Sequence, residues 1–227
     1  MSNQKIVAFD IIGTCFSLEK PRRQLLEIGS PAYALELWFA QALRDAFGFS
    51  HAGKYRPLKE VLQAELPRTL QLLDVELSSI QLEQIMAIFS ELELHHGAKE
   101  AFQTLTEAGW TIVALTNGSQ DSTHSLLKRA GVQKYFTEVF SCDAIAVTKP
   151  HPDVYKMIKM DDLAEVWLVA AHAWDIAGAK SIGMKTVFVR QLEKDYLKVY
   201  PQPQITVENL LEAACQIIKT ENYSPSN

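Results

Sequence analysis

The sequence predicts an α/β fold in which a parallel sheet is flanked by helices and interrupted by an inserted helical subdomain. Short runs rich in Val and Ile alternate with segments of helical periodicity, a pattern typical of parallel strands that helices cover on both faces. One long interval, residues 19–94, has helical periodicity but no convincing strand. With 227 residues, 48% of them hydrophobic, the chain is long enough for one sizeable core.

Five apolar runs are expected as the strands of the sheet. They are Lys5–Ile11, Trp110–Thr116, Val139–Ile145, Val166–Ala171 and Lys185–Arg190. The helices expected between them end before a glycine, which readily adopts the positive φ of a helix C-cap. These helices are Ala98–Ala108, Ser122–Ala130 and Asp175–Ile182, followed by Gly109, Gly131 and Gly183. The repeat of helix, glycine and strand indicates a Rossmann-like core.

The interval between the first two strands is expected to form a helical cap. Its amphipathic segments lie at 35–47, 58–73 and 80–92. Because the interval leaves the core at the end of the first strand, it is expected to cover the carboxyl ends of the strands, where open α/β sheets bind ligands. We expect the core domain to comprise residues 1–18 and 95–227, and the cap domain to comprise residues 19–94. Within the core range, residues 221–227 are expected to be a disordered tail.

Composition and charge argue against two classes of partner. The chain has 22 Lys and Arg against 27 Asp and Glu, a formal net charge of −5, and no basic block, so nucleic acid is not expected. No apolar run approaches the length of a membrane span, and the polar start Met1–Lys5 has no signal-peptide character, so no membrane partner is expected and the protein is expected in the cytoplasm. The oligomeric state, a homodimer included, stays open.

Polar residues lie at or after the carboxyl ends of four of the expected strands. They are Asp10, Thr116, Asn117, Lys149, His172 and Asp175. Because the carboxyl ends of parallel strands meet at one edge of a sheet, we expect these side chains to converge beneath the cap. Two carboxylates, a lysine and small hydrogen-bonding groups in one buried place favour covalent catalysis with a carboxylate nucleophile.

Four motifs carry a resemblance to a known family. They are DIIGT at 10–14, LTNGS at 115–119, KPHPDVY at 149–155 and AHAWDIAGAK at 171–180. Their order and spacing resemble the haloacid dehalogenase superfamily, and within it the type II (L-)2-haloacid dehalogenase branch. The resemblance implies a Rossmann-like core with a helical cap and conversion of a small 2-haloalkanoic acid to a 2-hydroxy acid and halide through an aspartyl ester. It implies no cofactor and no metal.

The resemblance also assigns roles to residues. Asp10 would be the nucleophile, Lys149 would pair with it, and Asp175 would orient that lysine and the hydrolytic water. Thr14 would hydrogen-bond the nucleophile, and Tyr155 would complete the substrate pocket. Thr116 and Asn117 would hold the carboxylate or halide of the substrate.

Two positions distinguish dehalogenation from phosphatase chemistry. Phosphatases that resemble this family carry a second Asp two residues after the nucleophile, where it acts as general acid and base, and here that position is Ile12. Their Mg²⁺-binding acidic residue corresponds to Ala171. Both replacements favour the dehalogenase. A phosphatase acting on a small phosphate ester and a degenerate binding protein of the same fold remain the alternatives.

The cap departs from the pattern of the branch. Characterised members carry an arginine after a Trp on the first cap helix, where it receives the halide and the substrate carboxylate, but here Trp38 is followed by Phe39. Gln41 and Arg44 share a helix face, so Arg44 is a candidate replacement, with a solvated surface arginine as the alternative. Phe39 and Trp174 are expected either to line the pocket or to belong to the core; for Trp174 we prefer the pocket.

The last motif departs as well. A Ser and an Asn of the branch correspond to Ala170 and His172. His172 is expected to act as the base for the hydrolytic water, because imidazole titrates near neutral pH. A histidine that only packs or hydrogen-bonds is the alternative.

Overall fold

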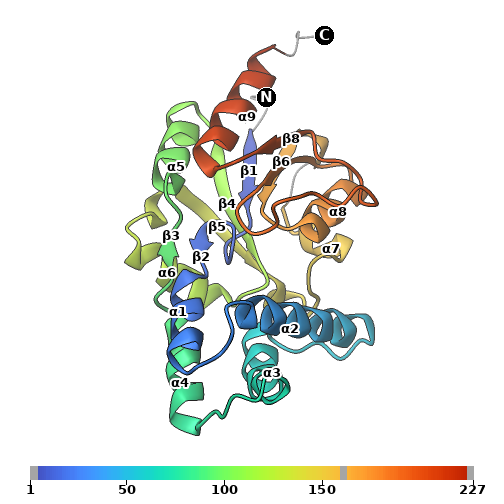
Figure 1. Cartoon of the computed structure of the whole chain (residues 1–227). Helices are drawn as coiled ribbons and strands as arrows, with labels where there is room; N and C mark the ends of the chain where they lie inside the picture. Colours follow the sequence, from blue (N-terminus) through green and yellow to red (C-terminus); the bar gives the residue numbers. More distant parts are fainter. Residues whose placement is uncertain (1–4, 159–162, 224–227) are drawn as a thin grey trace.

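The computed structural model describes residues 5–158 and 163–223 and is built on a six-stranded parallel sheet with the order β5-β4-β1-β6-β7-β8. The strands are β1 (Ile6–Phe9), β4 (Thr111–Thr116), β5 (Phe136–Ser141), β6 (Val166–Ala170), β7 (Lys185–Val189) and β8 (Ile205–Val207). The chain runs outward from β1 through β4 to β5, and on the other side from β6 to β8 (Figure 1). The predicted α/β fold is confirmed, with β1 at the centre of the sheet.

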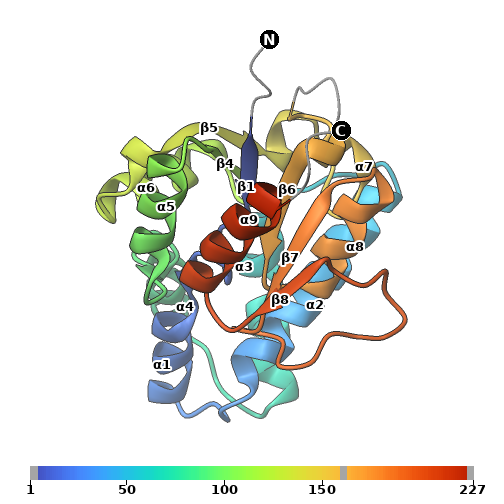
Figure 2. The same ribbon diagram turned by 90° about the horizontal axis from the view of Figure 1, so that it is seen from above.

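Helices cover both faces of the sheet (Figure 2). On one face lie α5 (Ala98–Glu107), α6 (Gln120–Arg129) and α9 (Leu210–Tyr223), and on the other α7 (Pro152–Tyr155) and α8 (Ala173–Ser181). Strand residues alternate between the two cores, since Val7 and Phe9 belong to the first and Ile6 and Ala8 to the second. Within the described part of the chain, no helix is long and apolar enough to cross a membrane.

The two ends of the sheet differ from the prediction. The expected strand Val139–Ile145 begins earlier, at Phe136, and ends at Ser141, where the Ser141 hydroxyl accepts from the Asp143 backbone N–H at 3.2 Å and a short 3₁₀ turn follows. An edge strand tolerates polar residues such as Glu138, so β5 has a weak apolar signal. The edge strand β8 was not predicted because its three residues are shorter than a recognisable strand run.

The long interval after β1 forms helices α1 (Glu19–Glu27), α2 (Ala34–His51), α3 (Leu58–Leu72) and α4 (Ser79–Ile88). They lie beyond the carboxyl ends of the strands (Figure 1). Two short antiparallel strands, β2 (Phe16–Ser17) and β3 (Glu93–Leu94), pair where this helical segment joins the sheet. Trp38 of α2 is fully buried and donates its indole N–H to the Leu62 carbonyl of α3 at 2.9 Å.

The expected disordered tail begins too early. Helix α9 continues through Tyr223, and the Glu221 carboxylate accepts from Trp167 Nε1 at 2.9 Å and from Lys185 Nζ at 2.8 Å. Glu221 is therefore an anchored helical residue, because these bonds tie the last turn of α9 to strands β6 and β7. The rest of that expectation, residues 224–227, lies outside the described residues.

Candidate functional site

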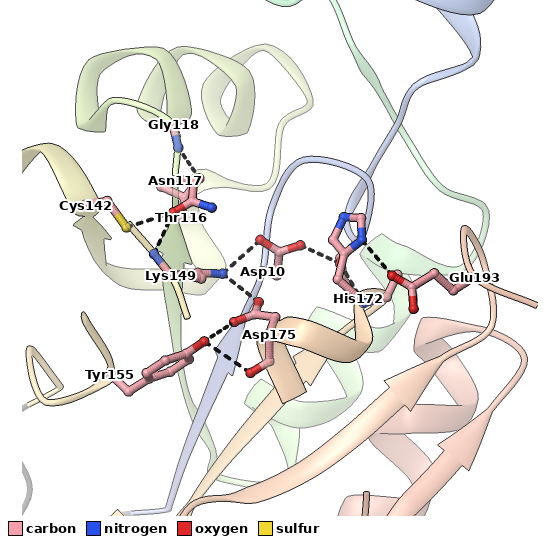
Figure 3. Close-up of polar contacts among 12 residues, drawn as sticks. Asp10, Thr116, Asn117, Gly118, Cys142, Lys149, Tyr155, His172, Asp175 and Glu193 are labelled. Atoms are coloured by element: carbon pink, nitrogen blue, oxygen red, sulfur yellow. Dashed lines mark hydrogen bonds and ion pairs between the residues drawn. The ribbon is translucent and has the colours of Figure 1, made fainter. Parts of the chain in front are cut away.

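Two carboxylates and a lysine meet at the carboxyl edge of the sheet (Figure 3). Asp10 directly follows β1, Asp175 lies in the first turn of α8, and Lys149 lies in the loop after β5. The Lys149 ammonium donates to Asp10 Oδ1 at 2.9 Å and to Asp175 Oδ2 at 2.7 Å. Lys149 and Asp175 are fully buried, and Asp10 is 5% exposed. The end of the central strand β1 is thus followed by a carboxylate, Asp10, that is screened from bulk water and paired with one cation, Lys149.

Burial and charge act in opposite directions on the lysine. Burial alone would lower the pKa of Lys149, but the charges of Asp10 and Asp175 raise that pKa above its usual range. Burial raises the pKa of Asp175, against the opposing effect of Lys149. Lys149 therefore remains an ammonium at neutral pH and supplies a permanent positive charge beside the Asp10 carboxylate.

Thr14 satisfies the other oxygen of Asp10. Its hydroxyl donates to Asp10 Oδ2 at 2.6 Å and accepts from the Ala171 backbone N–H at 2.9 Å. The turn between them places Gly13 at a φ of 85°, a conformation that residues with a side chain rarely adopt. The DIIGT sequence thereby folds back on itself, and both oxygens of Asp10 have a hydrogen-bond donor.

Tyr155 lies behind Asp175 and not in the wall of a pocket. Its hydroxyl donates to Asp175 Oδ1 at 2.6 Å, and its ring is fully buried between α7 and α8. The expectation that Tyr155 contacts substrate is therefore wrong. A Cβ built on Gly178 would fall 2.3 Å from the Tyr155 hydroxyl, so the close approach of the ring requires a glycine there. Tyr155 fixes the orientation of Asp175 from the far side of the site.

Thr116 and Asn117 form the next strand end. Asn117 Oδ1 accepts from the Lys149 backbone N–H and from Cys142 Sγ, both at 3.0 Å. Thr116 Oγ1 accepts from the Gly118 backbone N–H at 3.0 Å. Because these bonds occupy the amide oxygen of Asn117, its side-chain N–H₂ group is the donor that remains for a ligand.

A small space adjoins Asp10. Its volume is about 20 Å³, room for about one water molecule. Its walls come from the strand ends, from α2 and α3 and from the start of α8: Asp10, Ile12, Phe39, Leu43, Leu58, Thr116, Asn117, Gly118, His172 and Trp174. We call it the reaction space. Phe39 and Trp174 both line it, and Phe39 also belongs to the buried core, so both of its expected positions hold.

His172 stands at this space, and Glu193 holds its ring. Nδ1 of His172 lies 3.4 Å from Glu193 Oε1, while Glu193 Oε2 accepts from the Ala173 backbone N–H at 3.1 Å. The imidazole stacks on the Trp174 ring with 5.0 Å between centroids. The opposite nitrogen, Nε2, faces Gly13, where a built Cβ would lie 3.4 Å away. With Nδ1 directed at a carboxylate, the favoured neutral tautomer leaves Nε2 as a proton acceptor toward the Asp10 turn.

A second cavity of about 650 Å³ lies beside the reaction space along α2. Arg44 lies at its wall, but the guanidinium donates to both oxygens of the adjacent Asp45, at 2.7 and 3.0 Å. Gln41 faces α3, where its amide oxygen accepts from the Thr69 hydroxyl at 2.7 Å. The expected substrate contact of Gln41 is therefore wrong, because this side chain belongs to the interface between α2 and α3.

Comparison with known proteins assigns the family. A family model described as haloacid dehalogenase-like hydrolase matches residues 4–183. The chain belongs to this family. Within it, the chain is 28% identical to an (S)-2-haloacid dehalogenase of Xanthobacter autotrophicus, over 85% of this chain and 78% of the relative. It is 26% identical to (S)-2-haloacid dehalogenase 4A of Burkholderia cepacia, over 81% of each chain.

Solved structures share the fold of this haloacid dehalogenase-like hydrolase. The L-2-haloacid dehalogenase of Xanthobacter autotrophicus superposes with a TM-score of 0.84 at 23% identity, over 94% of this chain and 98% of that one. A structure of the same protein with chloropropionic acid covalently bound has a TM-score of 0.83 at 23% identity, over the same shares of both chains. At this identity the likeness establishes the arrangement of the sheet and helices.

The two carboxylates at the site of this hydrolase are already paired with protein donors. All four carboxylate oxygens of Asp10 and Asp175 accept a hydrogen bond, from Lys149, Thr14 or Tyr155. A cation bound between the two carboxylates would have to displace the Lys149 ammonium, which already neutralises them. In residues 5–158 and 163–223 there is no group of three or more His, Cys, Asp and Glu side chains that could hold a metal ion.

Proposed function

We propose that this hydrolase is a 2-haloacid dehalogenase. It would convert a 2-haloalkanoic acid to a 2-hydroxy acid and a halide ion through an ester on Asp10. The observation that carries the proposal is the buried carboxylate of Asp10, which pairs with Lys149 and lines the reaction space. Two residues after Asp10, the same space is lined by the apolar side chain of Ile12. Relatives that match most of the chain are named (S)-2-haloacid dehalogenases, which supports the same reaction.

In the first step an oxygen of Asp10 attacks C2 of the substrate. The new C–O bond forms as the C–halogen bond breaks, and the halide leaves with the bonding electron pair on the opposite side of C2, which inverts that carbon. Lys149 and Thr14 hold the attacking carboxylate in one orientation, which removes the entropic cost of aligning it. The free N–H₂ group of Asn117, with Thr116, is the proposed contact of the substrate carboxylate.

In the second step water attacks the carbonyl carbon of the Asp10 ester. His172 accepts a proton from that water through Nε2, and Lys149 stabilises the negative charge that develops on the ester oxygen. Collapse of the intermediate breaks the bond between Asp10 and the product oxygen, which takes the proton back from His172. The second proton of the water is released from the Asp10 carboxyl group to solvent, which restores Asp10 as a carboxylate. Asp175 keeps Lys149 in place through both steps.

Helices α1–α4 act in this proposal as a cap domain, residues 19–94, over a core of residues 1–18 and 95–227. Phe39 of α2 and Trp174 of α8 close the reaction space. A volume near that of one water molecule keeps bulk solvent away from Asp10. Arg44 has no assigned contact with substrate, because its guanidinium is paired with Asp45.

The phosphatase alternative has weaker support. A glyceraldehyde 3-phosphate phosphatase of Pyrococcus abyssi is 30% identical, but over 45% of this chain. Phosphoryl transfer needs a metal or an equivalent cation at the transferred group and an acid for the leaving oxygen. Ile12 and Ala171 provide neither, and no observation in the described part of the chain replaces them.

Halide release distinguishes these functions. The purified protein would be incubated with chloroacetate and with each enantiomer of 2-chloropropionate and 2-bromopropionate, and separately with a generic phosphate ester, with and without Mg²⁺. We expect halide release without Mg²⁺, lost in Asp10→Asn and retained in Asp153→Asn, which changes an exposed carboxylate on α7. Phosphate release that depends on Mg²⁺ would establish the phosphatase instead. No phosphate release and no halide release, from 2-bromooctanoate either, would indicate a binding protein.

A single turnover in water enriched in ¹⁸O tests the covalent step. Because the hydrolytic water attacks the carboxyl carbon of Asp10, the heavy oxygen enters Asp10 in the first turnover, and the hydroxy acid keeps the original oxygen of Asp10. Mass spectrometry of the peptide that contains Asp10 reads this directly. Heavy oxygen in the product and not in that peptide would mean that water attacks the substrate itself, and the nucleophilic role of Asp10 would be abandoned.

A further inference from the structure

The 650 Å³ cavity shares walls with the reaction space. Phe39, Leu43, His172 and Trp174 line both. The two spaces therefore lie next to each other, the smaller around the nucleophile and the larger beside α2. We call the larger space the side chamber. A chamber of this size lies within the range of about 300–1,000 Å³ that small-molecule sites occupy.

The side chamber has an apolar wall built on one helix face. Leu35, Phe39, Leu43 and Phe47 recur every fourth residue along α2 and all line it. Trp174 faces them from α8, with its ring 5.2 Å from that of Phe47 at an interplanar angle of 67°. Leu18, which directly precedes α1, and Leu192, in the loop between β7 and β8, add apolar surface.

The charged residues at the chamber wall have protein partners. Glu36 pairs with Arg22, whose Nη1 donates to its carboxylate at 2.9 Å, and this hydrogen bond lowers the pKa of Glu36. Arg44 pairs with Asp45, and Glu193 accepts from the Ala173 backbone N–H at 3.1 Å. A polar ligand group would have to compete with these bonds. An apolar group displaces water alone, so the chamber favours an apolar occupant.

We propose that the side chamber takes the alkyl or aryl chain of the substrate, so that the protein acts on 2-haloacids of medium chain length in preference to those of two or three carbons. This inference rests on the proposed dehalogenation. A two- or three-carbon haloacid fills the volume of a few water molecules at about 30 Å³ each, far below the 650 Å³ available. With C2 at Asp10, the chain on C2 would reach the chamber by displacing Phe39 and Trp174, the side chains that line both spaces.

The first test is halide release across a homologous series from 2-bromopropanoic to 2-bromooctanoic acid. Burial of each additional methylene is expected to raise kcat/KM about fourfold until the chamber is filled. Ala40→Phe adds a ring at the chamber wall and should abolish this rise with chain length. Ala87→Phe is the matched control, because Ala87 is exposed on α4 and lies outside the chamber, and it should keep the rise.

The second test does not require catalysis. Calorimetry would measure binding of unhalogenated acids from butanoate to octanoate to the wild-type protein and to both variants. Affinity should rise about fourfold per methylene in the wild-type and Ala87→Phe proteins and stay flat in Ala40→Phe. Thermal unfolding of each variant would show that it is folded.

The two tests separate the chamber from the reaction. Length-dependent binding without any halide release would support the chamber and overturn the proposed dehalogenation. Halide release that peaks at 2-bromopropanoic acid, together with binding independent of chain length, would overturn the chamber and leave the reaction intact. An unchanged dependence on chain length in folded Ala40→Phe would also overturn the proposal for the chamber, because the alkyl chain of the substrate would then bind elsewhere.

Discussion

The polar cluster at the sheet edge and the side chamber beside α2 are built on opposite principles. In the cluster, Asp10, Lys149 and Asp175 are at most 5% exposed, and each charged group has partners within 2.6–2.9 Å. In the chamber, apolar side chains face an open volume, and the charged residues Glu36 and Arg44 at its wall pair with Arg22 and Asp45. The first region has one arrangement, whereas the second can accept ligands of different length.

This difference separates chemistry from selectivity. Each removal from the cluster leaves a buried charge without its partner, so catalysis and stability depend on the same residues. A change at the chamber wall alters volume and apolar area, and the fold tolerates it more easily. Substrate range can therefore change through α2 while the reaction at the strand ends stays the same.

The largest expected effect is that of Lys149→Ala. The variant leaves two buried carboxylates facing each other without a cation, so the free energy of unfolding should fall by about 3–5 kcal/mol and halide release should cease. Chemical denaturation and a halide assay measure both. Lys156→Ala is the control, since it breaks an exposed pair with Asp153 and should change neither measurement appreciably. Equal stability of the two variants would contradict a tightly coupled cluster.

His172→Ala comes next and affects one step only. Ester formation on Asp10 uses no base, whereas breakdown of the ester does, so breakdown should slow by about 10²- to 10⁴-fold. Mass spectrometry of the variant after mixing with substrate should then show a covalent adduct on Asp10. Normal turnover without an adduct would leave His172 as a residue that packs on Trp174.

Gly178→Ala tests how tightly the cluster is packed from behind. The new Cβ would fall 2.3 Å from the Tyr155 hydroxyl, so Tyr155 must move away from Asp175, at a cost of about 1–3 kcal/mol in unfolding free energy. Gly48→Ala is the matched change on α2, where nothing lies within 4 Å of the built Cβ. That variant should gain up to about 1 kcal/mol from helix propensity. Thermal melts should therefore show a lower melting temperature for Gly178→Ala and a higher one for Gly48→Ala. Shifts of the melting temperature in the same direction would contradict the expected contrast between the two regions.

The cluster could be predicted from sequence because each of its members follows a recognisable signal. Asp10, Asn117 and Lys149 end or follow apolar strands within short motifs, and parallel strands bring their carboxyl ends together. The four-residue spacing of Asp10 and Thr14 suffices for their hydrogen bond once Gly13 turns the chain. Strand order and local spacing, both written in the sequence, thus place these groups.

Tertiary packing decides what the sequence did not predict. The side chain of Gln41 is one helical turn from that of Arg44, yet it faces α3, because the position of α3 selects which side of α2 is buried. Tyr155 has the right spacing from Lys149 but lies on the far side of Asp175. Glu193 lies in no motif, and an acidic residue soon after a core strand was the only signal that pointed to it.

The smallest expected effect is that of Glu193→Gln, at the boundary where the two regions meet. Glu193 lines the side chamber and also directs Nδ1 of His172, so it is a positioning residue that acts through the imidazole. The amide can still accept from the Ala173 backbone N–H but no longer brings a negative charge to Nδ1, and its N–H₂ group can donate there instead. Part of the neutral imidazole then carries its proton on Nε2 and cannot accept one from water.

We therefore expect Glu193→Gln to slow breakdown of the Asp10 ester by about tenfold and to leave ester formation unchanged. Nitrogen NMR of ¹⁵N-labelled His172 should show Nδ1 protonated in the wild-type protein and a mixture of tautomers in the variant. Glu208→Gln is the control, since Glu208 pairs with Arg190 on the surface and should alter neither reading. A slower second step with an unchanged tautomer would mean that Glu193 acts through the shape of the chamber and not through the tautomer of His172.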